Sequence, residues 1–294
     1  MKISILTATF NRSKLLKRLY DSIVKNLNNK VEIEWLIMDD GSKDDTQKMV
    51  EGFIQDNKFD IQYYSQENSG KMVAINKLIP YSTGDLIIEC DSDDYFKENA
   101  FNIINKNYSL IDDNTYALCY LKYDQNECNI GNLFKEKETT MFDLYFKQGE
   151  DGEKALVYNA KIRKQFSYEL ENNEKFITEA RMHHKMDLKY KIKCFNEAIM
   201  ICEYQKEGYT NNIKEIFKKY PYGYYKYFKE MFDMDCKGIY FYKRMYLIKH
   251  YILFSSLTNV KFKEAFKNVK GTYNKILFTI LYIPGIIATK IKFK

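Results

Sequence analysis

Short apolar runs alternate with helix-type patterns through the first hundred residues, and this alternation constrains the fold more than any other feature of the chain. Between the runs, apolar residues recur at helical spacing, as Leu15, Leu19 and Ile23 do. Strands separated by helices of this length need right-handed crossovers, so the pattern predicts an α/β fold with a doubly wound, mostly parallel, Rossmann-like sheet. The four runs are Ile3 to Ala8, Ile33 to Met38, Ile61 to Tyr64 and Asp85 to Cys90.

Polar side chains follow each of the four predicted strands. In an open parallel sheet, ligands bind at the edge where the carboxyl ends of the strands meet. Four polar strand ends at that edge therefore predict a binding site. The residues are Thr9, Asn11 and Arg12 after the first strand, Asp39 and Asp40 after the second, Glu67 and Asn68 after the third, and Asp91, Asp93 and Asp94 after the fourth.

The acidic segment Asp91-Ser92-Asp93-Asp94 has two interpretations. Carboxylates this close repel one another unless a cation neutralises them, and oxygen ligands at a strand end suit Mg²⁺ or Mn²⁺ shared with a phosphate. The alternative is a solvated acidic turn that caps a helix. The sequence has neither a G-x-G-x-x-G after its first strand nor a P-loop motif. Phosphates would then be held by a metal rather than by a glycine-rich loop, which favours the metal site.

Four sequence blocks, in fixed order within residues 2 to 97, are similar to those of a known family. Their order and spacing resemble glycosyltransferase family 2, whose members have the nucleotide-diphospho-sugar (GT-A) fold. The blocks are Thr7-Ala8-Thr9-Phe10-Asn11-Arg12, then Asp39-Asp40-Gly41-Ser42, then Asn68-Ser69-Gly70-Lys71 with Ala74, Asn76, Gly84 and Asp85, and finally Asp91-Ser92-Asp93-Asp94.

The resemblance implies roles for residues that would bind a nucleotide-sugar. Thr9 and one of Asp39 and Asp40 would hold the base and ribose, and we favour Asp40 for the base edge. Asp91 would face the ribose and Lys71 the diphosphate. As alternatives, Asp39 is a turn residue before a glycine and Lys71 is a solvated helix start. The resemblance also places Thr7, Asn11, Arg12 and Ser92 at the nucleotide-sugar.

The same resemblance implies a divalent metal cofactor, Mn²⁺ or Mg²⁺. Asp93 would be its direct ligand, with Asp91 and Asp94 close by. The metal would stabilise the departing diphosphate during sugar transfer.

A candidate catalytic base lies in the second, less similar part of the chain. The segment from Phe176 to Ala180 stands where the family usually has an F-x-x-E-D sequence, so the resemblance implies that Glu179 is the base. An inverting transfer needs one carboxylate to take the proton from the attacking hydroxyl. Ala180 departs from the family pattern, since a second acid is common there. The alternative is that Glu179 is a first-turn helix acid, with Thr178 as the cap.

Two histidines follow the candidate base. His183 lies four residues after Glu179, so on a helix the two would share a face, and either His183 or the adjacent His184 could contact the metal or the acceptor. Further on, the stretch from Cys202 to Thr210 resembles the segment that ends the family's catalytic domain. The sequence lacks the Q-x-x-R-W of processive synthases, so the resemblance favours transfer of a single sugar.

The charge balance changes near residue 212. Residues 213–294 contain 17 Lys and Arg against 5 Asp and Glu, whereas residues 1–212 contain 29 against 35. This predicts a catalytic domain at 1–212, with a nucleotide-sugar half at 1–97 and an acceptor-side half at 98–212, and a helical extension at 213–294. Six cysteines without a C-x-x-C pair and a start without a signal-peptide pattern predict a cytoplasmic protein.

The basic extension is also rich in aromatic residues, with 11 Tyr and 9 Phe. Helices with mixed aromatic and cationic faces suit anionic lipid headgroups, so we expect peripheral binding to the inner face of the cell membrane. The apolar run Ile276 to Thr289 has 14 residues and contains Pro284-Gly285. Because a spanning helix needs about 20 residues, an interfacial or re-entrant segment is expected. The alternatives are packing on the catalytic domain or in a homodimer; nucleic acid is not expected, because it leaves the apolar run without a role.

These features predict an inverting, metal-dependent hexosyl- or N-acetylhexosaminyltransferase. It would move one sugar from a UDP-sugar to a lipid-linked or cell-envelope polysaccharide acceptor. One alternative is a sugar-phosphate nucleotidyltransferase of the same fold, but its glycine-rich basic loop is absent after the first strand. The other is a non-catalytic scaffold that binds a nucleotide-sugar, which missing carboxylates would support.

Overall fold

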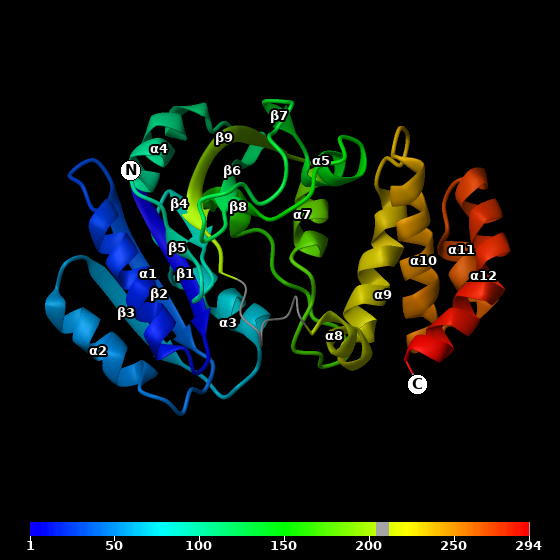
Figure 1. The fold of residues 1–294 in the computed structure, drawn as a ribbon, viewed down its shortest axis with the longest axis horizontal. Coiled ribbons are helices and arrows are strands. Elements are labelled where there is room, and N and C mark those ends of the chain that lie inside the picture. The colour runs from blue at the N-terminus through cyan, green and yellow to red at the C-terminus, as the bar shows by residue number, and fades with distance from the viewer. Residues whose placement is uncertain (204–211, 294) are drawn as a thin grey trace. The chain divides into compact units, whose positions relative to one another are not determined.

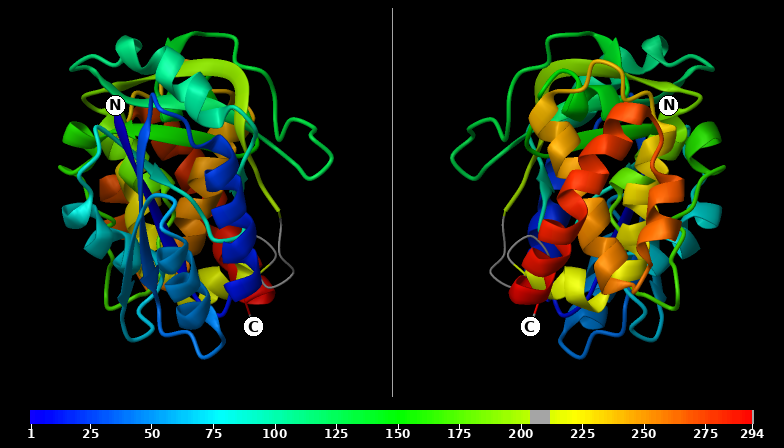
Figure 2. Two further views of the ribbon diagram at one scale, coloured as in Figure 1. Left: turned by 90° about the vertical axis from the view of Figure 1, so that its left-hand side faces the viewer. Right: turned by 90° about the vertical axis from the view of Figure 1, so that its right-hand side faces the viewer.

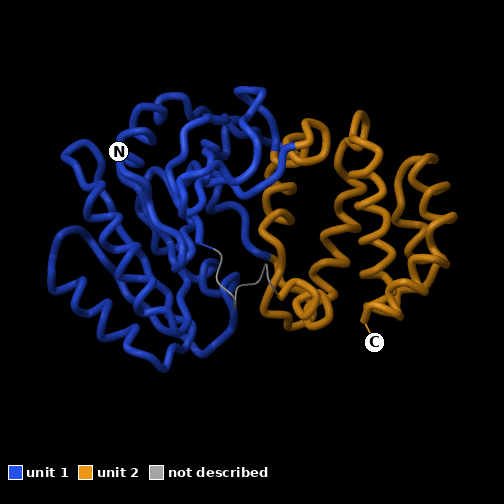
Figure 3. The backbone as a smooth tube through the Cα atoms, in the orientation of Figure 1, with its two compact units in different colours: residues 1–140, 150–168, 189–206 blue, residues 141–149, 169–188, 207–294 orange. Residues whose placement is uncertain are grey.

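The structure is a computed structural model that describes residues 1–203 and 212–293, and these residues form two compact units. Unit 1 comprises residues 1–140, 150–168 and 189–206, and unit 2 comprises residues 141–149, 169–188 and 207–294, less the residues outside the described ranges (Figure 3). The segment around 204–210 that resembles the end of the family's catalytic domain lies outside the described residues, as does the approach to the predicted boundary at 212. That boundary stays a prediction.

Unit 1 is built on one nine-stranded sheet with the order β3-β2-β1-β4-β8-β6-β9-β5, in which β7 pairs with β9 (Figure 1). The first four strands are all parallel, as β1 pairs with β2 and β4, and β2 with β3. The strands are β1 (Lys2–Thr9), β2 (Glu32–Asp39), β3 (Asp60–Ser65), β4 (Leu86–Glu89), β5 (Tyr95–Phe96), β6 (Thr115–Tyr123), β7 (Glu138–Thr139), β8 (Lys154–Asn159) and β9 (Lys191–Ile201).

The remaining strands make the sheet mixed. β8 is antiparallel to both β4 and β6, whereas β6 and β9 are parallel. The prediction of an α/β fold with a doubly wound, mostly parallel sheet is confirmed, and all four predicted strands are present. The parallel half places the carboxyl ends of β1, β2, β3 and β4 at one edge.

Helices cover both faces of the sheet in unit 1. Alternate residues of β1 point to opposite faces, so Ile3 and Ile5 join the main core with residues of α1, α2 and α4, while α3 packs on β1 and β2 outside that core. Within the core, Tyr20 of α1 stacks on Phe53 of α2 at 4.2 Å. The helices are α1 (Ser13–Asn26), α2 (Thr46–Asp56), α3 (Lys71–Leu78), α4 (Ala100–Asn107), α6 (Ala160–Arg163) and the 3₁₀ turns η1 (Ile79–Tyr81) and η2 (Tyr108–Leu110).

Unit 2 is helical in its described residues, with α10, α11 and α12 side by side (Figures 1 and 2). Its core is aromatic: Tyr224 stacks on Phe254 at 4.9 Å, and Tyr225 stacks on Tyr251 at 5.8 Å. Its helices are α5 (Met141–Phe146), α7 (Ala180–Asp187), α8 (Ile213–Lys219), α9 (Pro221–Glu230), α10 (Phe241–Leu257), α11 (Phe262–Asn268), α12 (Thr272–Lys292) and the 3₁₀ turn η3 (Met231–Asp233).

The structure corrects two expectations for the aromatic extension. The aromatic residues of α9 do not form an exposed face, because Tyr224, Tyr225 and Phe228 are buried in the core of unit 2. The C-terminal apolar run of 14 residues is part of a longer element, because α12 continues through Pro284 as one helix of 21 residues. This helix is long and apolar enough to cross a membrane by length and composition alone. The sequence count was short because it excluded the polar residues at both ends of the helix.

Candidate active site

The acidic segment after β4 lies at the predicted edge of the sheet, and each of its three carboxylates pairs with a different cation. The three acids and the three cations balance in formal charge. One partner begins α3, one follows β1, and one lies on β6. The pairs are Asp91 with Lys71 (2.5 Å between Oδ1 and Nζ), Asp93 with Arg12 (2.9 Å between Oδ2 and Nη1) and Asp94 with Lys122 (2.7 Å between Oδ2 and Nζ).

The three carboxylates differ in exposure and in proton affinity. The Asp91 side chain is 44% exposed, compared with 15% for Asp93 and 3% for Asp94. Burial would raise the pKa of Asp91, but Lys71 and Lys122 together hold that pKa below its ordinary value. Burial and the charge of Asp91 raise the pKa of Asp93. Burial, with the charge of Asp91, also raises the pKa of Asp94, although Lys122 opposes the shift. The neighbouring cations therefore favour the ionised form of Asp91, whereas burial opposes ionisation of Asp93 and Asp94.

Lys122 is a site residue that sequence reasoning missed. It lies near the end of β6, after the apolar run Tyr116 to Leu121, and its ammonium also approaches Glu153 at 3.4 Å. The opposite charges of Asp94 and Glu153 raise the pKa of Lys122, despite its burial. The sequence feature that could have indicated Lys122 is a lysine directly after a buried apolar run.

The end of β1 separates a structural threonine from one that faces the site. Thr7, predicted to contact the nucleotide-sugar, is fully buried and its hydroxyl accepts a hydrogen bond from Trp35 Nε1 at 2.9 Å. Thr7 therefore has a hydrogen-bond partner within the protein core, and its predicted contact with the nucleotide-sugar stays a prediction. Thr9 is also buried, and within the described residues its hydroxyl oxygen has no hydrogen-bond partner. An unpaired buried hydroxyl is costly, so Thr9 is suited to receive a ligand atom.

The residues after Thr9 connect the strand ends to one another. Asn11 adopts a left-handed conformation, with φ of 52°, and exchanges hydrogen bonds with the β2–α2 loop. Its backbone N–H donates to Ser42 Oγ, while its side-chain oxygen accepts from the Lys43 backbone N–H, both at 2.8 Å. Arg12 donates to Ser92 Oγ at 3.3 Å in addition to its ion pair, which links β1 to the acidic segment.

Asp39 and Asp40 at the end of β2 are both buried but bind different partners. Asp39 accepts from the Ser42 backbone N–H and from the Tyr63 hydroxyl, each at 2.7 Å. Asp40 accepts three hydrogen bonds from the β3–α3 loop, from Gln66 Nε2 and from the backbone N–H groups of residues 69 and 70. Asp40 therefore organises the loop that leads to Lys71, and its role at the base edge stays a prediction.

Two arginines that were not predicted from the sequence stabilise the residues on either side of Asp91. Arg163 of α6 is fully buried and contacts Glu89, the last residue of β4, at 2.6 Å, while the Tyr168 hydroxyl donates to the other oxygen of Glu89 at 2.5 Å. Arg18 of α1 donates to the backbone oxygen of Asp93 at 2.6 Å. Together they fix the backbone on both sides of Asp91 without contacting its carboxylate.

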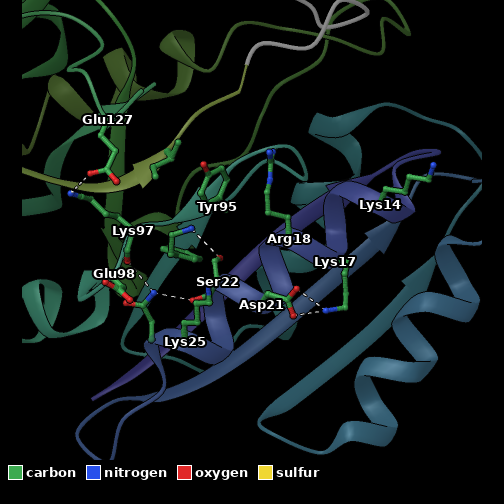
Figure 4. A pocket seen from close by; sticks show the side chains of 13 residues that line it. Lys14, Lys17, Arg18, Asp21, Ser22, Lys25, Tyr95, Lys97, Glu98 and Glu127 are labelled. Carbon is green, nitrogen blue, oxygen red and sulfur yellow. Dashed lines mark hydrogen bonds and ion pairs between the residues drawn. The ribbon is translucent and has the colours of Figure 1, made fainter. Parts of the chain in front are cut away.

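Arg18 also lines a cavity of about 590 Å³ beside the acidic segment (Figure 4). Its guanidinium lies 4.5 Å from the centre of the Tyr95 ring, and Lys97 and Glu127 form an ion pair on the same wall. The lining residues are Lys14, Lys17, Arg18, Asp21, Ser22, Lys25, Asn26, Tyr95, Phe96, Lys97, Glu98, Glu127 and Ile201.

The candidate base and the two histidines belong to unit 2 and are described with it. Glu179 immediately precedes α7, whose N-terminal turn it begins. His183 and His184 are both buried, and the ring of His184 contacts the rings of Phe142 and Tyr227 at 5.6 Å. Burial lowers the pKa of His184 to about 3, so this histidine is neutral at pH 7 and the aromatic contacts indicate a packing role. No cluster of three or more His, Cys, Asp or Glu side chains suited to a metal occurs in the described part of the chain.

The sheet order and the acidic strand end define the class of fold. A parallel β3-β2-β1-β4 half, an antiparallel continuation and carboxylates after β4 are the architecture of the nucleotide-diphospho-sugar (GT-A) fold, as solved structures of similar shape bear out. Residues 4–157 match the family model described as glycosyl transferase family 2, and the chain belongs to that family.

Three curated relatives illustrate the similarity in sequence. An uncharacterized glycosyltransferase of Mycoplasma genitalium, MG060, is 36% identical over 110 residues, which are 36% of this chain and 37% of the relative. Glycosyltransferase GlyG of Streptococcus pneumoniae is 27% identical over 241 residues, 74% of this chain and 78% of the relative. The poly(ribitol-phosphate) β-N-acetylglucosaminyltransferase TarS of Staphylococcus aureus is 28% identical over 100 residues, 34% of this chain and 18% of the relative. The match to MG060 thus spans little more than a third of that relative's length.

Two solved structures illustrate the similarity in fold. TarS residues 1–349 from Staphylococcus aureus, in complex with UDP-GlcNAc, align over 100% of this chain and 88% of their own with a TM-score of 0.62 and 18% identity. The mannosyltransferase PcManGT from Pyrobaculum calidifontis, in complex with GDP-Man and Mn²⁺, aligns over 99% of this chain and 83% of its own with a TM-score of 0.56 and 13% identity. The GT-A fold predicted from the sequence is confirmed.

Proposed function

We propose that the protein is a glycosyltransferase that moves one sugar from a UDP-sugar to a cell-envelope polymer or a lipid-linked glycan. The observation that carries the proposal is the convergence of charged side chains from β1, β2, β4, β6 and α3 at one sheet edge. The names of TarS and GlyG, and the UDP-GlcNAc bound to TarS, support a nucleotide-sugar donor. We place the activity on the cytoplasmic side of the membrane, where nucleotide-sugars and reduced cysteines are both expected.

The residues at the edge suit the two halves of such a donor. The unpaired hydroxyl of Thr9 and the buried carboxylate of Asp39 lie at the ends of adjacent strands, where a nucleoside would be bound. Lys71 is the first residue of α3, so its ammonium and the positive end of the helix both favour a diphosphate. Arg12 offers a second cation to the same group.

A divalent cation, Mn²⁺ or Mg²⁺, fits the acidic segment. The donor set consists of carboxylate oxygens, which these hard cations prefer. Burial and the neighbouring charge of Asp91 raise the pKa of Asp93, and a bound cation would offset both effects. Such ions bind one or two carboxylates together with substrate phosphates, so a larger protein cluster is not required. We assign Asp93 and the exposed Asp91 as its ligands, while Asp94 faces Lys122 and supports the loop. When bound there, the cation supplies charge that stabilises the departing diphosphate.

The transfer itself needs a base for the acceptor hydroxyl, and we propose Glu179 for this role. A carboxylate that takes the hydroxyl proton during attack gives inversion at the sugar carbon in a single displacement. Glu179 lies at the start of α7, where the positive end of the helix dipole attracts a carboxylate.

The test is nucleotide-sugar hydrolysis and binding with the complete chain. We expect one UDP-sugar, tested first as UDP-GlcNAc, to bind and to be hydrolysed only when Mn²⁺ or Mg²⁺ is present. The Asp93→Asn variant should lower the metal-dependent rate at least about 100-fold, as expected for loss of one electrostatic group from an active site. Asp113→Asn, on an exposed turn before β6, is the matched control and should retain the rate.

Two results would contradict the proposal. The first is that no member of a UDP- and GDP-sugar panel binds or turns over. The second is that Asp93→Asn turns over as fast as Asp113→Asn. The role of Glu179 is tested separately, because Glu179→Gln should bind the donor normally and lose at least about 100-fold in transfer.

A further inference from the structure

Helix α12 exposes a continuous apolar face that unit 2 does not cover. Its residues recur at spacings of three and four, so they share one side of the helix. Three of them are more exposed than buried by a wide margin: Ile280 at 65%, Ile283 at 69% and Ile291 at 72%. The full face, called here the isoleucine stripe, is Tyr273, Ile276, Ile280, Ile283, Ile287 and Ile291.

The opposite side of α12 holds the helix in unit 2. Phe278 is fully buried, with its ring centre 5.9 Å from that of Tyr251 on α10, and Gly285 packs closely against Ile252. Arg244 of α10 donates to the Asn274 side chain at 2.6 Å. The opposite side of the helix therefore anchors it in unit 2, and the isoleucine stripe is left largely exposed.

The lysines near the isoleucine stripe indicate which kind of partner it would bind. No acidic residue follows Glu264 in the sequence, and five lysines lie between that residue and the end of α12. Lys275 and Lys290 lie within the helix near its two ends, and Lys292 is its last residue. An exposed apolar stripe bordered by cations complements an anionic lipid surface. A second copy of the same face would instead bring lysines against lysines.

We propose that α12 is an in-plane membrane anchor, in which the isoleucine stripe enters the boundary between headgroups and acyl chains of an anionic bilayer. From Tyr273 to Ile291 the stripe extends about 27 Å along the helix, at 1.5 Å per residue. Tyr273 at one end is an amphipathic aromatic residue of the kind that favours the membrane interface. Lys275 and Lys290 lie near the two ends of the stripe. The Lys275 ammonium lies 5.3 Å from the centre of the Phe266 ring of α11, and the long side chain of Lys290 can reach lipid phosphates.

The same contacts argue against a membrane-spanning orientation, although the length of α12 would permit one. A spanning helix is surrounded by lipid or by other membrane helices. In that orientation the Arg244–Asn274 hydrogen bond and the packing of Phe278 on α10 would both be lost. An in-plane helix keeps these contacts and still removes the stripe from water.

The test measures binding of the complete protein to vesicles by co-sedimentation. Vesicles of phosphatidylcholine containing about 30% phosphatidylglycerol provide the anionic surface, and pure phosphatidylcholine vesicles provide the neutral one. We expect strong binding to the anionic vesicles, weak binding to the neutral ones, and a decrease with salt. The triple variant Ile280→Asn, Ile283→Asn, Ile287→Asn should lower the bound-to-free ratio at least about tenfold, which corresponds to about 1.4 kcal/mol.

A matched triple variant separates the stripe from general surface apolarity. Ile54→Asn, Leu110→Asn and Leu133→Asn replace exposed apolar residues of unit 1, which are 42%, 44% and 53% exposed, and should leave vesicle binding unchanged. Circular dichroism and donor hydrolysis report folding of both variants. Because hydrolysis depends on unit 1 residues, failure of the anchor and failure of the proposed enzyme are distinguishable.

Three outcomes would overturn the proposal. Equal sedimentation of the wild type and the stripe variant would remove the role of the stripe. Resistance of the bound wild-type protein to alkaline carbonate extraction would indicate a spanning helix. A wild-type dimer in solution that the stripe variant converts to a monomer, without a change in vesicle binding, would indicate a protein interface.

Discussion

Replacement of Lys122 by Met should destabilise unit 1 strongly, because it removes the sole close cationic partner that the described residues give Asp94. The Lys122 side chain is 12% exposed and that of Asp94 is 3% exposed, so solvent screens the pair weakly. Methionine keeps the length and the apolar stem of lysine, so the change tests the charge rather than the packing.

The magnitude follows from the distance between the charges. At 2.7 Å and an effective dielectric constant of about 20, the attraction between the two groups is about 6 kcal/mol before desolvation is counted. Loss of one partner of a buried pair costs about 3–5 kcal/mol. Asp94 can limit the loss by taking a proton, which at pH 7 costs about 4 kcal/mol from the ordinary Asp pKa. The expected loss in free energy of unfolding is therefore about 3–4 kcal/mol.

The assay is urea unfolding at pH 7. The comparison variants are Asp94→Asn, the double variant Asp94→Asn with Lys122→Met, and Glu153→Gln. Asp94→Asn combined with Lys122→Met should recover at least about 2 kcal/mol relative to Lys122→Met, because it removes the uncompensated charge. Glu153→Gln should cost less than about 1 kcal/mol, because Glu153 is 42% exposed and 3.4 Å from the ammonium. The reasoning fails if Lys122→Met costs less than about 1 kcal/mol, or if the effects of Lys122→Met and Asp94→Asn simply add.

Two further predictions concern the supports of the sheet. Arg163→Met should lower the free energy of unfolding by about 3–5 kcal/mol, because it leaves Glu89 buried beside Tyr168 without its cation. In urea unfolding, adding Glu89→Gln to Arg163→Met should recover part of this loss. Additive effects of the two changes would contradict the pairing. Burial opposes ionisation of Glu34, but hydrogen bonds from Ser4 and residue 83, together with Lys2, lower its pKa. The ionised form of Glu34 therefore stabilises the protein above the ordinary Glu pKa. That contribution is lost as the pH falls toward the lowered pKa. The stability difference between wild type and Glu34→Gln should be about 1–3 kcal/mol at pH 7 and shrink below about pH 4, and a difference independent of pH would refute this assignment.

Much of the fold and part of the candidate site could be predicted from the sequence. The strand and helix signals are periodic over a few residues, so they appear in the sequence before any long-range contact is known. The acids after β4 and the residues after β1 and β2 lie next to their strands along the chain, so their placement at one edge follows from a parallel sheet. The order of the four sequence blocks then indicated the family that the comparison identified.

The partners of those residues could not be predicted, because they come from distant parts of the chain. Lys122 reaches Asp94 across 28 residues, and Arg163 reaches Glu89 across 74. Nothing local to Thr7 shows that its hydroxyl faces Trp35 while that of Thr9 is left without a partner. Such pairings depend on strand order and on which face each side chain takes.

The basic, aromatic extension shows the same division. Its composition, which local sequence determines, correctly indicated helices rich in aromatic and cationic residues. Only the tertiary structure decided that the aromatic residues of α9 form a core and that the isoleucines of α12 stay exposed. The physical reason is that a helix has several faces, and burial of apolar area on one face depends on which neighbours pack there. The sequence by itself determined the elements, the family and the acidic strand end, while the packed structure decided which charges and faces remain available to a ligand or a membrane.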